Sequence, residues 1–263
     1  MKLIQSRDNP FYKSLVKLVD SARWRDKNRQ TLLDGVHLLE SYLDAGKLPL
    51  HILLHPDALD SREISVLLKR VANVPVTQLD SKLFSTLSEL KTHTGILTLI
   101  ELPQAEELMT PCHFALLLEG IQDPGNMGSM LRSAAAAGCE AVFLSAECTD
   151  AWSPKVLRAA MGGHFSLRIH ERQNLFAVAQ AFSGILLATS LQATHSLYDC
   201  DLKHDVAFLI GNEGAGLSDE LLNVATCQIT IPMMGKIESL NAAAAAAVCL
   251  FEAARQKQTV SRR

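Results

Sequence analysis

The chain has 263 residues, of which 48% are hydrophobic and 20% charged, and its formal net charge is −3. This composition is typical of a globular protein with a sizeable core. No stretch of about 18 apolar residues is present, which argues against a membrane helix. The first residues lack the apolar core of a signal peptide. We therefore expect a cytoplasmic protein that does not bind a membrane.

The six cysteines and nine histidines are scattered along the chain. No cysteine forms a C-x-x-C pair, and none stands at metal-ligand spacing with a histidine. We expect free buried thiols in a reducing compartment and no metal ion.

Basic residues are concentrated at the start of the chain. Residues 1–30 contain eight lysines and arginines against three aspartates. Such an excess is typical of a surface that binds a polyanion, and equally of a solvated helical face. The candidate contacts to a polyanion are Arg23, Arg25 and Arg29.

Helical and strand patterns are mixed in the first hundred residues. Apolar residues recur at helical spacing over 11–19, 32–43, 61–72 and 81–90. Short apolar runs favour strands at 51–55, 74–76 and 95–100. These patterns predict a small α/β domain over residues 1–100. A linker is expected at 101–112, where two prolines and three glutamates show no periodicity.

Strands and helices alternate strictly after the linker. The apolar strand candidates are 114–118, 141–144, 184–188, 206–210 and 227–231. The helical patterns cover 127–137, 154–161, 173–182, 218–225 and about 240–256. This alternation predicts a mostly parallel sheet covered by helices on both faces. We place this second domain at residues 113–258.

Ligands of an open parallel sheet bind beyond the carboxyl ends of its strands, and three polar or glycine-rich segments have that position. The first segment runs from Asp123 to Ala134. Gly125 and Gly128 permit a close approach of the backbone. Asn126 lies at the expected start of a helix, where it could be an N-cap, and Arg132 lies about one and a half turns further on.

The second segment, Gly211 to Ser218, joins a strand to a helix through a glycine-rich turn. Such a turn can hold a nucleotide-like ligand through its backbone N–H groups. It is neither a P-loop nor a G-x-G-x-x-G fingerprint. Glu213 would repel a phosphate, which favours a ligand with a positive or hydroxyl-bearing part.

The third segment, Ile231 to Asn241, leaves a strand through a proline and an apolar loop. We expect Ser239 to start the final helix as its N-cap. Asn241 is a poor helix former that opens an otherwise ideal run of alanines, and it is therefore a candidate for a site.

Together the three segments resemble the motifs of the SpoU/TrmH family of RNA 2′-O-ribose methyltransferases, a branch of the SPOUT superfamily. The family patterns are Asp-Pro-x-Asn-x-Gly-x-x-x-Arg-Ser-Ala, Gly-x-Glu-x-x-Gly-Leu-Ser and Ile-Pro-Met-x-Gly-x-x-x-Ser-Leu-Asn. They occur here in the family's order. One departure follows Asn241, where Ala242-Ala243 replaces the usual Val-Ser. Residues 1–100 resemble, more loosely, an L30e-like RNA substrate-binding domain.

The resemblance implies a C-terminal trefoil knot, a homodimer, and S-adenosyl-L-methionine as the cofactor. By position, the implied cofactor contacts are Gly211, Ile231, Met233 and Leu240. The implied substrate is RNA rather than DNA, since the 2′-hydroxyl distinguishes the two. Family members with this N-terminal domain tend to act on ribosomal RNA, often 23S.

The implied catalytic residues are Arg132, Asn126, Glu213, Ser239 and Asn241. The family proposal gives the base role to Arg132, assisted by an RNA phosphate. Because a guanidinium holds its proton tightly, a second possibility is that Arg132 only holds the phosphate. The other four residues would position the ribose, the arginine and the cofactor.

Other functions are also compatible with parts of the sequence. The same activity could be directed at tRNA, or the fold could serve a non-catalytic RNA-binding or ribosome-assembly protein. A nucleotide-dependent oxidoreductase is disfavoured by the missing G-x-G-x-x-G fingerprint.

Overall fold

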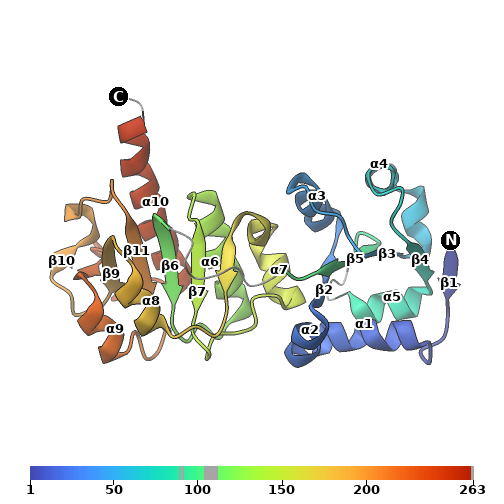
Figure 1. Cartoon of the computed structure of the whole chain (residues 1–263), viewed down its shortest axis with the longest axis horizontal. Coiled ribbons are helices and arrows are strands. Elements are labelled where there is room, and N and C mark those ends of the chain that lie inside the picture. Colours follow the sequence, from blue (N-terminus) through green and yellow to red (C-terminus); the bar gives the residue numbers. More distant parts are fainter. Residues whose placement is uncertain (89, 91, 104–111, 262–263) are drawn as a thin grey trace. The chain divides into compact units, whose positions relative to one another are not determined.

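The computed structural model describes residues 1–88, 90, 92–103 and 112–261, without the side chains of 259–261. The chain divides into two compact units, each built on its own sheet (Figure 1). The first unit comprises Met1–Gln104 and Trp152–Phe165, and the second comprises Ala105–Ala151 and Ser166–Arg263. Most of the predicted linker, 104–111, lies outside the described residues.

The first unit contains a five-stranded mixed sheet with the order β1-β4-β3-β5-β2. β1, β4 and β3 are parallel, whereas β5 runs antiparallel to both β3 and β2. The strands are β1 (Lys2–Ile4), β2 (Gln30–Asp34), β3 (His51–Leu54), β4 (Val76–Leu79) and β5 (Ile96–Glu101). The helices are α1 (Pro10–Asp20), α2 (Ala22–Asn28), α3 (Val36–Asp44), α4 (Arg62–Arg70) and α5 (Ser81–Leu87).

Two predictions for this unit are wrong. The strand proposed at 74–76 lies mostly before β4, which starts at Val76. The helical spacing proposed over 32–43 begins inside a strand, because β2 occupies Gln30–Asp34 and pairs with β5. Leu32 and Leu33 are both fully buried, so this strand is covered on both faces and lacks the alternation that marks a half-exposed strand. Gly35, with φ of +108°, then turns the chain into α3.

Side chains alternate between the two faces of this sheet. Leu53 and Leu79 pack with α1 and α5, whereas Ile52 and Leu54 pack with α3 and α4. The segment Trp152–Phe165, which the sequence places in the second half, belongs to this unit. It contains α7 (Pro154–Ala160), and Thr31 Oγ1 donates a hydrogen bond of 2.9 Å to the Trp152 carbonyl.

The second unit contains a seven-stranded sheet, entirely parallel, with the order β10-β12-β9-β11-β6-β7-β8. Its strands are β6 (Phe114–Leu118), β7 (Ala141–Leu144), β8 (Arg168–His170), β9 (Ile185–Thr189), β10 (His195–Ser196), β11 (Val206–Ile210) and β12 (Cys227–Thr230). The predicted parallel α/β sheet is confirmed. The edge strands β8 and β10 were not predicted, because they are too short to show a pattern.

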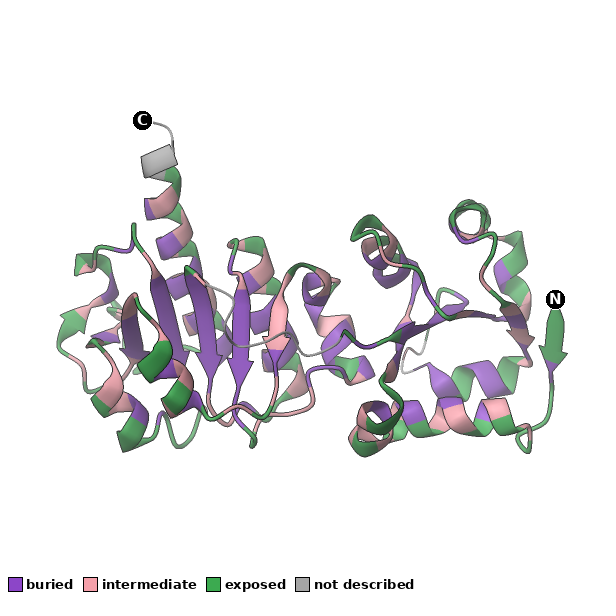
Figure 2. Cartoon of the chain, in the orientation of Figure 1, coloured by how far each residue is buried: buried purple, intermediate pink, exposed green. Residues whose placement is uncertain are grey.

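Helices cover both faces of this sheet, as Figure 1 shows. They are α6 (Pro124–Ala136), α8 (Leu175–Ala181), α9 (Asp219–Val224) and α10 (Ala242–Ser261). Ala207 and Leu209 of β11 pack with α8 and α9, and α10 packs on β11 and α6. Every residue of β6 and β11 is buried, which colours these strands purple in Figure 2. The continuous apolar runs in the sequence follow from this double cover.

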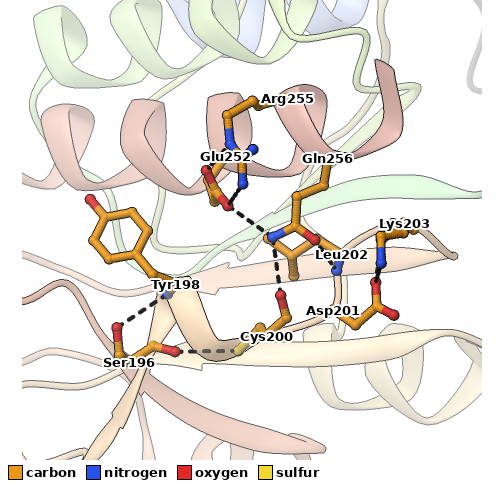
Figure 3. Close-up of polar contacts among 9 residues, drawn as sticks. All are labelled: Ser196, Tyr198, Cys200, Asp201, Leu202, Lys203, Glu252, Arg255 and Gln256. Atoms are coloured by element: carbon orange, nitrogen blue, oxygen red, sulfur yellow. Dashed lines mark hydrogen bonds and ion pairs between the residues drawn. The ribbon is translucent and has the colours of Figure 1, made fainter. Parts of the chain in front are cut away.

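The side chain of Gln256 fixes the far end of α10 (Figure 3). Its Oε1 accepts from the Leu202 N–H at 2.9 Å, and its Nε2 donates to the Cys200 carbonyl at 3.0 Å. The same Nε2 also donates to Glu252 at 2.8 Å. Hydrogen bonds from Arg255, and then from Gln256, hold the pKa of the Glu252 carboxyl below its ordinary value. The buried amide thus ties α10 to the segment that precedes β11.

None of the described helices is long and apolar enough to cross a lipid bilayer. Within the described ranges, no three or more histidine, cysteine, aspartate or glutamate side chains come together in a way that could hold a metal ion.

Candidate active site

The three predicted motif segments begin at the carboxyl ends of β6, β11 and β12. β6 and β11 are neighbours whose last residues, Leu118 and Ile210, are paired. β12 lies beyond β9 on the other side of β11. Because all strands are parallel, the three segments leave the same edge of the sheet, which we call the carboxyl edge.

The first segment starts α6, and its N-cap is Asp123. Asp123 Oδ1 accepts from the Asn126 N–H at 2.7 Å, and Pro124 occupies the first helical position. Of the two interpretations of Asn126, the N-cap is therefore excluded. As the third residue of α6, Asn126 keeps its side-chain amide available for contacts outside the helix.

The second segment folds into a tight turn organised by Asn212. Asn212 Oδ1 accepts from the N–H groups of Gly214 and Ala215 at 2.8 and 3.2 Å. Its Nδ2 donates to the Gly120 carbonyl at 2.8 Å, which ties the turn to the end of β6. A Cβ atom on Gly211 would collide with the backbone of Gly216 and Leu217. Only glycine fits at Gly211, because two backbone stretches meet there.

A chain of side-chain hydrogen bonds joins the three segments. Asn241 Nδ2 donates to Asn126 Oδ1 at 3.0 Å, and Asn126 Nδ2 donates to Glu213 Oε1. We call Asn126, Glu213 and Asn241 the central triad. Their sequence separations of 87 and 115 residues show that only the fold brings them together.

Asn241 also caps α10. Its Oδ1 accepts from the N–H groups of Ala243 and Ala244 at 2.9 and 3.4 Å. The predicted cap, Ser239, lies two residues before this position and is exposed. The prediction that Ser239 is the N-cap is therefore wrong, because the helix begins at Ala242 rather than near Leu240.

The other two predicted catalytic residues are outside the central triad. Arg132 and Ser239 are exposed, and neither has a hydrogen-bond or ion-pair partner among the described residues. Arg132 follows Asn126 by six positions, which turns it about 120° around the helix and moves it about 9 Å along the axis. Within one chain, Arg132 therefore points away from the direction of Asn126.

The predicted cofactor contacts lie close in sequence to two triad residues. Gly211 precedes Glu213, and Ile231, Met233 and Leu240 precede Asn241. Gly211 is buried in its turn, Ile231 and Met233 are half-buried, and Leu240 is exposed. Ile231, Met233 and Leu240 offer apolar surface in the segment that leads from β12 to Asn241. The triad itself contains no cation, which suits S-adenosylmethionine because its sulfonium is positively charged. The residues present therefore fit the implied cofactor.

A fourth segment at the carboxyl edge was missed by sequence reasoning. β9 ends at Thr189, between β11 and β12, and Thr189 Oγ1 donates to the Leu209 carbonyl at 3.2 Å. Leu191, two residues further on, is 72% exposed. The one signal in the sequence is the position of this segment after an apolar strand.

The three arginines predicted to bind RNA lie in the first unit and differ in exposure. Arg23 and Arg29 are exposed. Arg25 is 5% exposed, and its guanidinium donates to the carbonyls of Leu18 and Val19 at 2.5 and 2.9 Å. Arg25 thus joins α2 to the end of α1, and this structural role corrects its assignment as an RNA contact.

Comparisons with known proteins identify the family of this chain. The SpoU rRNA methylase family model matches residues 113–251. An uncharacterized tRNA/rRNA methyltransferase of Synechocystis sp. is 35% identical over 264 residues, covering 98% of this chain and 95% of the relative. The 23S rRNA (guanosine(2553)-2′-O)-methyltransferase of Bacillus subtilis is 31% identical over 254 residues, covering 95% and 98%.

A solved structure supports the same grouping over the whole chain. The AdoMet-bound rRNA methyltransferase from Sinorhizobium meliloti superposes with a TM-score of 0.83 at 28% identity, and the match covers 97% of each chain. The resemblance in the three motifs is thereby confirmed: the chain belongs to the SpoU rRNA methylase family.

Proposed function

We propose that this protein is an S-adenosylmethionine-dependent RNA 2′-O-ribose methyltransferase. The observation that carries the proposal is the central triad, which joins the three motif segments through consecutive hydrogen bonds at the carboxyl edge. Ligands of parallel α/β sheets bind at this edge. The cofactor supplies a transferable methyl group, so the work of the protein is to align the ribose hydroxyl and assist the loss of its proton.

The proposed substrate is ribosomal RNA, of the large-subunit 23S class, in the cytoplasm. The relative from Bacillus subtilis is named for a 2′-O-methylation of 23S rRNA, and the match covers 98% of its length. The relative from Synechocystis is named for both tRNA and rRNA, so tRNA is the second candidate. Mapping 2′-O-methylation on total RNA with and without the gene would decide between them.

The finer features of the fold belong to the proposal as well. We propose an L30e-like fold for the first unit and a trefoil knot in the second. β12 lies outside β9, whereas α10 packs on β11 and α6. The segment between them must therefore cross the carboxyl ends of β9 and β11, and this return path is compatible with a knotted crossing.

A homodimer is proposed from the apolar surface of the last segments. Met234 and Ile237 are 98% and 73% exposed, and Leu240 and Phe251 are exposed by 40% and 49%. Three of them lie within seven residues of one segment, and exposed apolar side chains that gather in one place mark an interface more often than a free surface. Sedimentation equilibrium would give twice the chain mass of 28.7 kDa, and a monomer at micromolar concentration would contradict the proposal.

Arg23 and Arg29 are the proposed RNA contacts of the first unit. Reversing both to glutamate should weaken RNA binding and flatten its salt dependence, since each phosphate contact releases counterions. Arg62→Glu combined with Lys69→Glu is the control with the same change of charge, because both residues are exposed on α4, which packs on the opposite face of the sheet from α1 and α2. Equal salt slopes for all three proteins would remove these contacts.

The activity itself is tested through Arg132. Arg132→Ala should remove methyl transfer to ribosomal RNA while leaving S-adenosylmethionine affinity nearly unchanged, because Arg132 is outside the central triad. Calorimetry with the cofactor and radiolabelled methyl incorporation measure the two effects separately. Cofactor binding by the wild-type protein also separates an enzyme from a non-catalytic RNA-binding protein. Full turnover by the variant would contradict the role of Arg132.

A further inference from the structure

One aromatic side chain of the first unit lies among exposed cations. Residues 17–29, at the end of α1 and along α2, contain five lysines and arginines against two aspartates. Lys17, Arg23 and Lys27 are exposed, and Trp24 is half-buried. The ammonium groups of Lys17 and Lys27 lie 4.5 and 5.8 Å from the centroid of the Trp24 ring. We call Lys17, Arg23, Trp24 and Lys27 the tryptophan surface.

The backbone that carries Trp24 is fixed by its neighbours. The Trp24 N–H donates to Ser21 Oγ at 3.2 Å, and Asn28 Nδ2 donates to the Trp24 carbonyl at 2.8 Å. The next residue, Arg25, is buried and joins α2 to the end of α1. The ring is therefore held in one place before a ligand arrives, which lowers the entropy cost of binding to it.

The other tryptophan of the chain has a different environment. Trp152 is 6% exposed, and its ring packs against His164 with 4.9 Å between the centroids. Trp24 also packs against the core of its unit, but it keeps exposed area and is approached by two exposed lysines. A role in packing accounts for the buried part of Trp24 and leaves its exposed part without an explanation.

A stacked nucleic acid base suits this exposed part better than an ammonium group does. At an exposed site, the attraction between a lysine and an aromatic ring is weak. Stacking of a base on an aromatic side chain is stronger, and it does not depend on the identity of the base. A base can therefore replace an ammonium group on the ring of Trp24, and the displaced lysine is then free to bind a neighbouring phosphate.

We propose that the tryptophan surface binds an unpaired nucleotide of the RNA substrate, an inference that rests on the proposed function. The base stacks on Trp24, and Lys17, Arg23 and Lys27 hold the phosphates on either side of it. Bases inside a duplex are stacked on one another and offer no free face, whereas the bases of loops and bulges do. The surface therefore selects single-stranded RNA, which charge alone would not do.

Tryptophan fluorescence reports this stacking directly, because the chain has two tryptophans and Trp152 is buried. The probes are poly(U), a single-stranded RNA, and a duplex of poly(A) and poly(U). We expect poly(U) to quench the fluorescence of the wild-type protein, the duplex to quench it much less, and neither to quench Trp24→Phe. Unchanged fluorescence with poly(U), or equal quenching in Trp24→Phe, would overturn the stacking. Equal quenching by the duplex would overturn the selection of unpaired nucleotides.

Two substitutions at Trp24 separate stacking from packing. Trp24→Phe keeps an aromatic face, whereas Trp24→Leu keeps only apolar contact with the core. We expect Leu to weaken poly(U) binding about tenfold and Phe to weaken it less, with duplex binding unchanged in both. Chemical denaturation shows whether each variant is folded. A folded Leu variant that binds poly(U) as tightly as the wild type would overturn the proposal, and if Leu does not fold, the fluorescence comparison with Phe still decides.

The phosphate contact is tested at Lys17. Lys17→Ala should reduce the slope of log affinity against log salt concentration for poly(U) by about 0.7, the value for one phosphate contact to a single strand. Lys69→Ala is the matched control, because Lys69 is exposed on α4, on the opposite face of the sheet. Equal slopes for the two variants would overturn the contact of Lys17 with phosphate.

The proposed function is measured separately, by calorimetry with S-adenosylmethionine and by methyl incorporation into ribosomal RNA. If the wild-type protein methylates RNA but poly(U) leaves its fluorescence unchanged, this inference alone fails. If poly(U) stacks on Trp24 but the protein neither binds the cofactor nor methylates RNA, the proposed function fails and the tryptophan surface remains an RNA-binding site.

Discussion

The seven-stranded sheet has a carboxyl edge, where its strands end, and an amino edge, where they begin. The charged and polar side chains at these two edges differ in their bonding partners. At the amino edge, His113 pairs with Asp205 at 3.0 Å and Arg168 with Glu140 at 3.4 Å. Lys257 donates to the His204 carbonyl at 2.6 Å. At the carboxyl edge, the partner of Glu213 among the described residues is the neutral side-chain amide of Asn126.

The bonding partners of the charged groups indicate the ligand site better than the shape of the surface does. An open pocket of about 250 Å³ lies at the amino edge, lined in part by His113, Glu140 and Lys257. Its charged groups are already bonded to the fold, so they stabilise structure. At the carboxyl edge, Glu119 and Asp123 also bond to the backbone, whereas the described partner of Glu213 is a side chain that comes from another segment. We therefore place the chemistry around Glu213.

The largest effect on stability and cofactor binding is expected from Gly211→Ala, at the carboxyl edge. The added Cβ would collide with the backbone of Gly216 and Leu217, so we expect a loss of about 3 kcal/mol in the free energy of unfolding together with the loss of cofactor binding. Gly214→Ala is the control for stability, because its Cβ would meet only Asn212 Oδ1 at 3.4 Å. Chemical denaturation measures the stability of both variants, and calorimetry measures cofactor binding. Equal stability of the two variants would contradict the tight turn.

A smaller effect is expected from Gln256→Ala, near the carboxyl end of α10. The substitution leaves the Leu202 N–H and the Cys200 carbonyl without this partner, which should cost about 1–3 kcal/mol. Because the triad lies at the other end of the helix, kcat at low temperature should be retained. Gln258→Ala, exposed on the same helix, should have little effect on the denaturation midpoint. A catalytic defect larger than the stability loss would show that the edges are coupled.

The smallest effect concerns the pair of His113 and Asp205. The hydrogen bond and charge of Asp205 raise the pKa of His113 above its ordinary value. The pair therefore stabilises the fold fully below the unfolded pKa of about 6.5, and its contribution is lost as pH rises through the raised pKa. NMR titration should show a lower His113 pKa in Asp205→Asn, and methylation should be unaffected. An altered methylation rate would contradict a purely structural amino edge.

The alternation of apolar strands with helices predicted the parallel sheet of the second unit, but it missed β8 and β10 and included α7, which belongs to the first unit. β6, β7 and β11 begin and end at the predicted residues, because strands buried on both faces give uninterrupted apolar runs. The three motif segments were likewise placed correctly at strand ends. The first unit was harder, since β2 is equally buried and its leucines mimic helical spacing when read together with α3.

The contacts of the site could be decided only by the tertiary structure. The sequence identified Asn126, Glu213 and Asn241 as separate candidates, two of them explicable as local caps or turns. Their hydrogen bonds span 87 and 115 residues, and no local pattern encodes such a distance. The fold also reassigned Asn241 as the cap and buried Arg25. Composition and periodicity report local burial, whereas a network of side chains depends on which strands become neighbours.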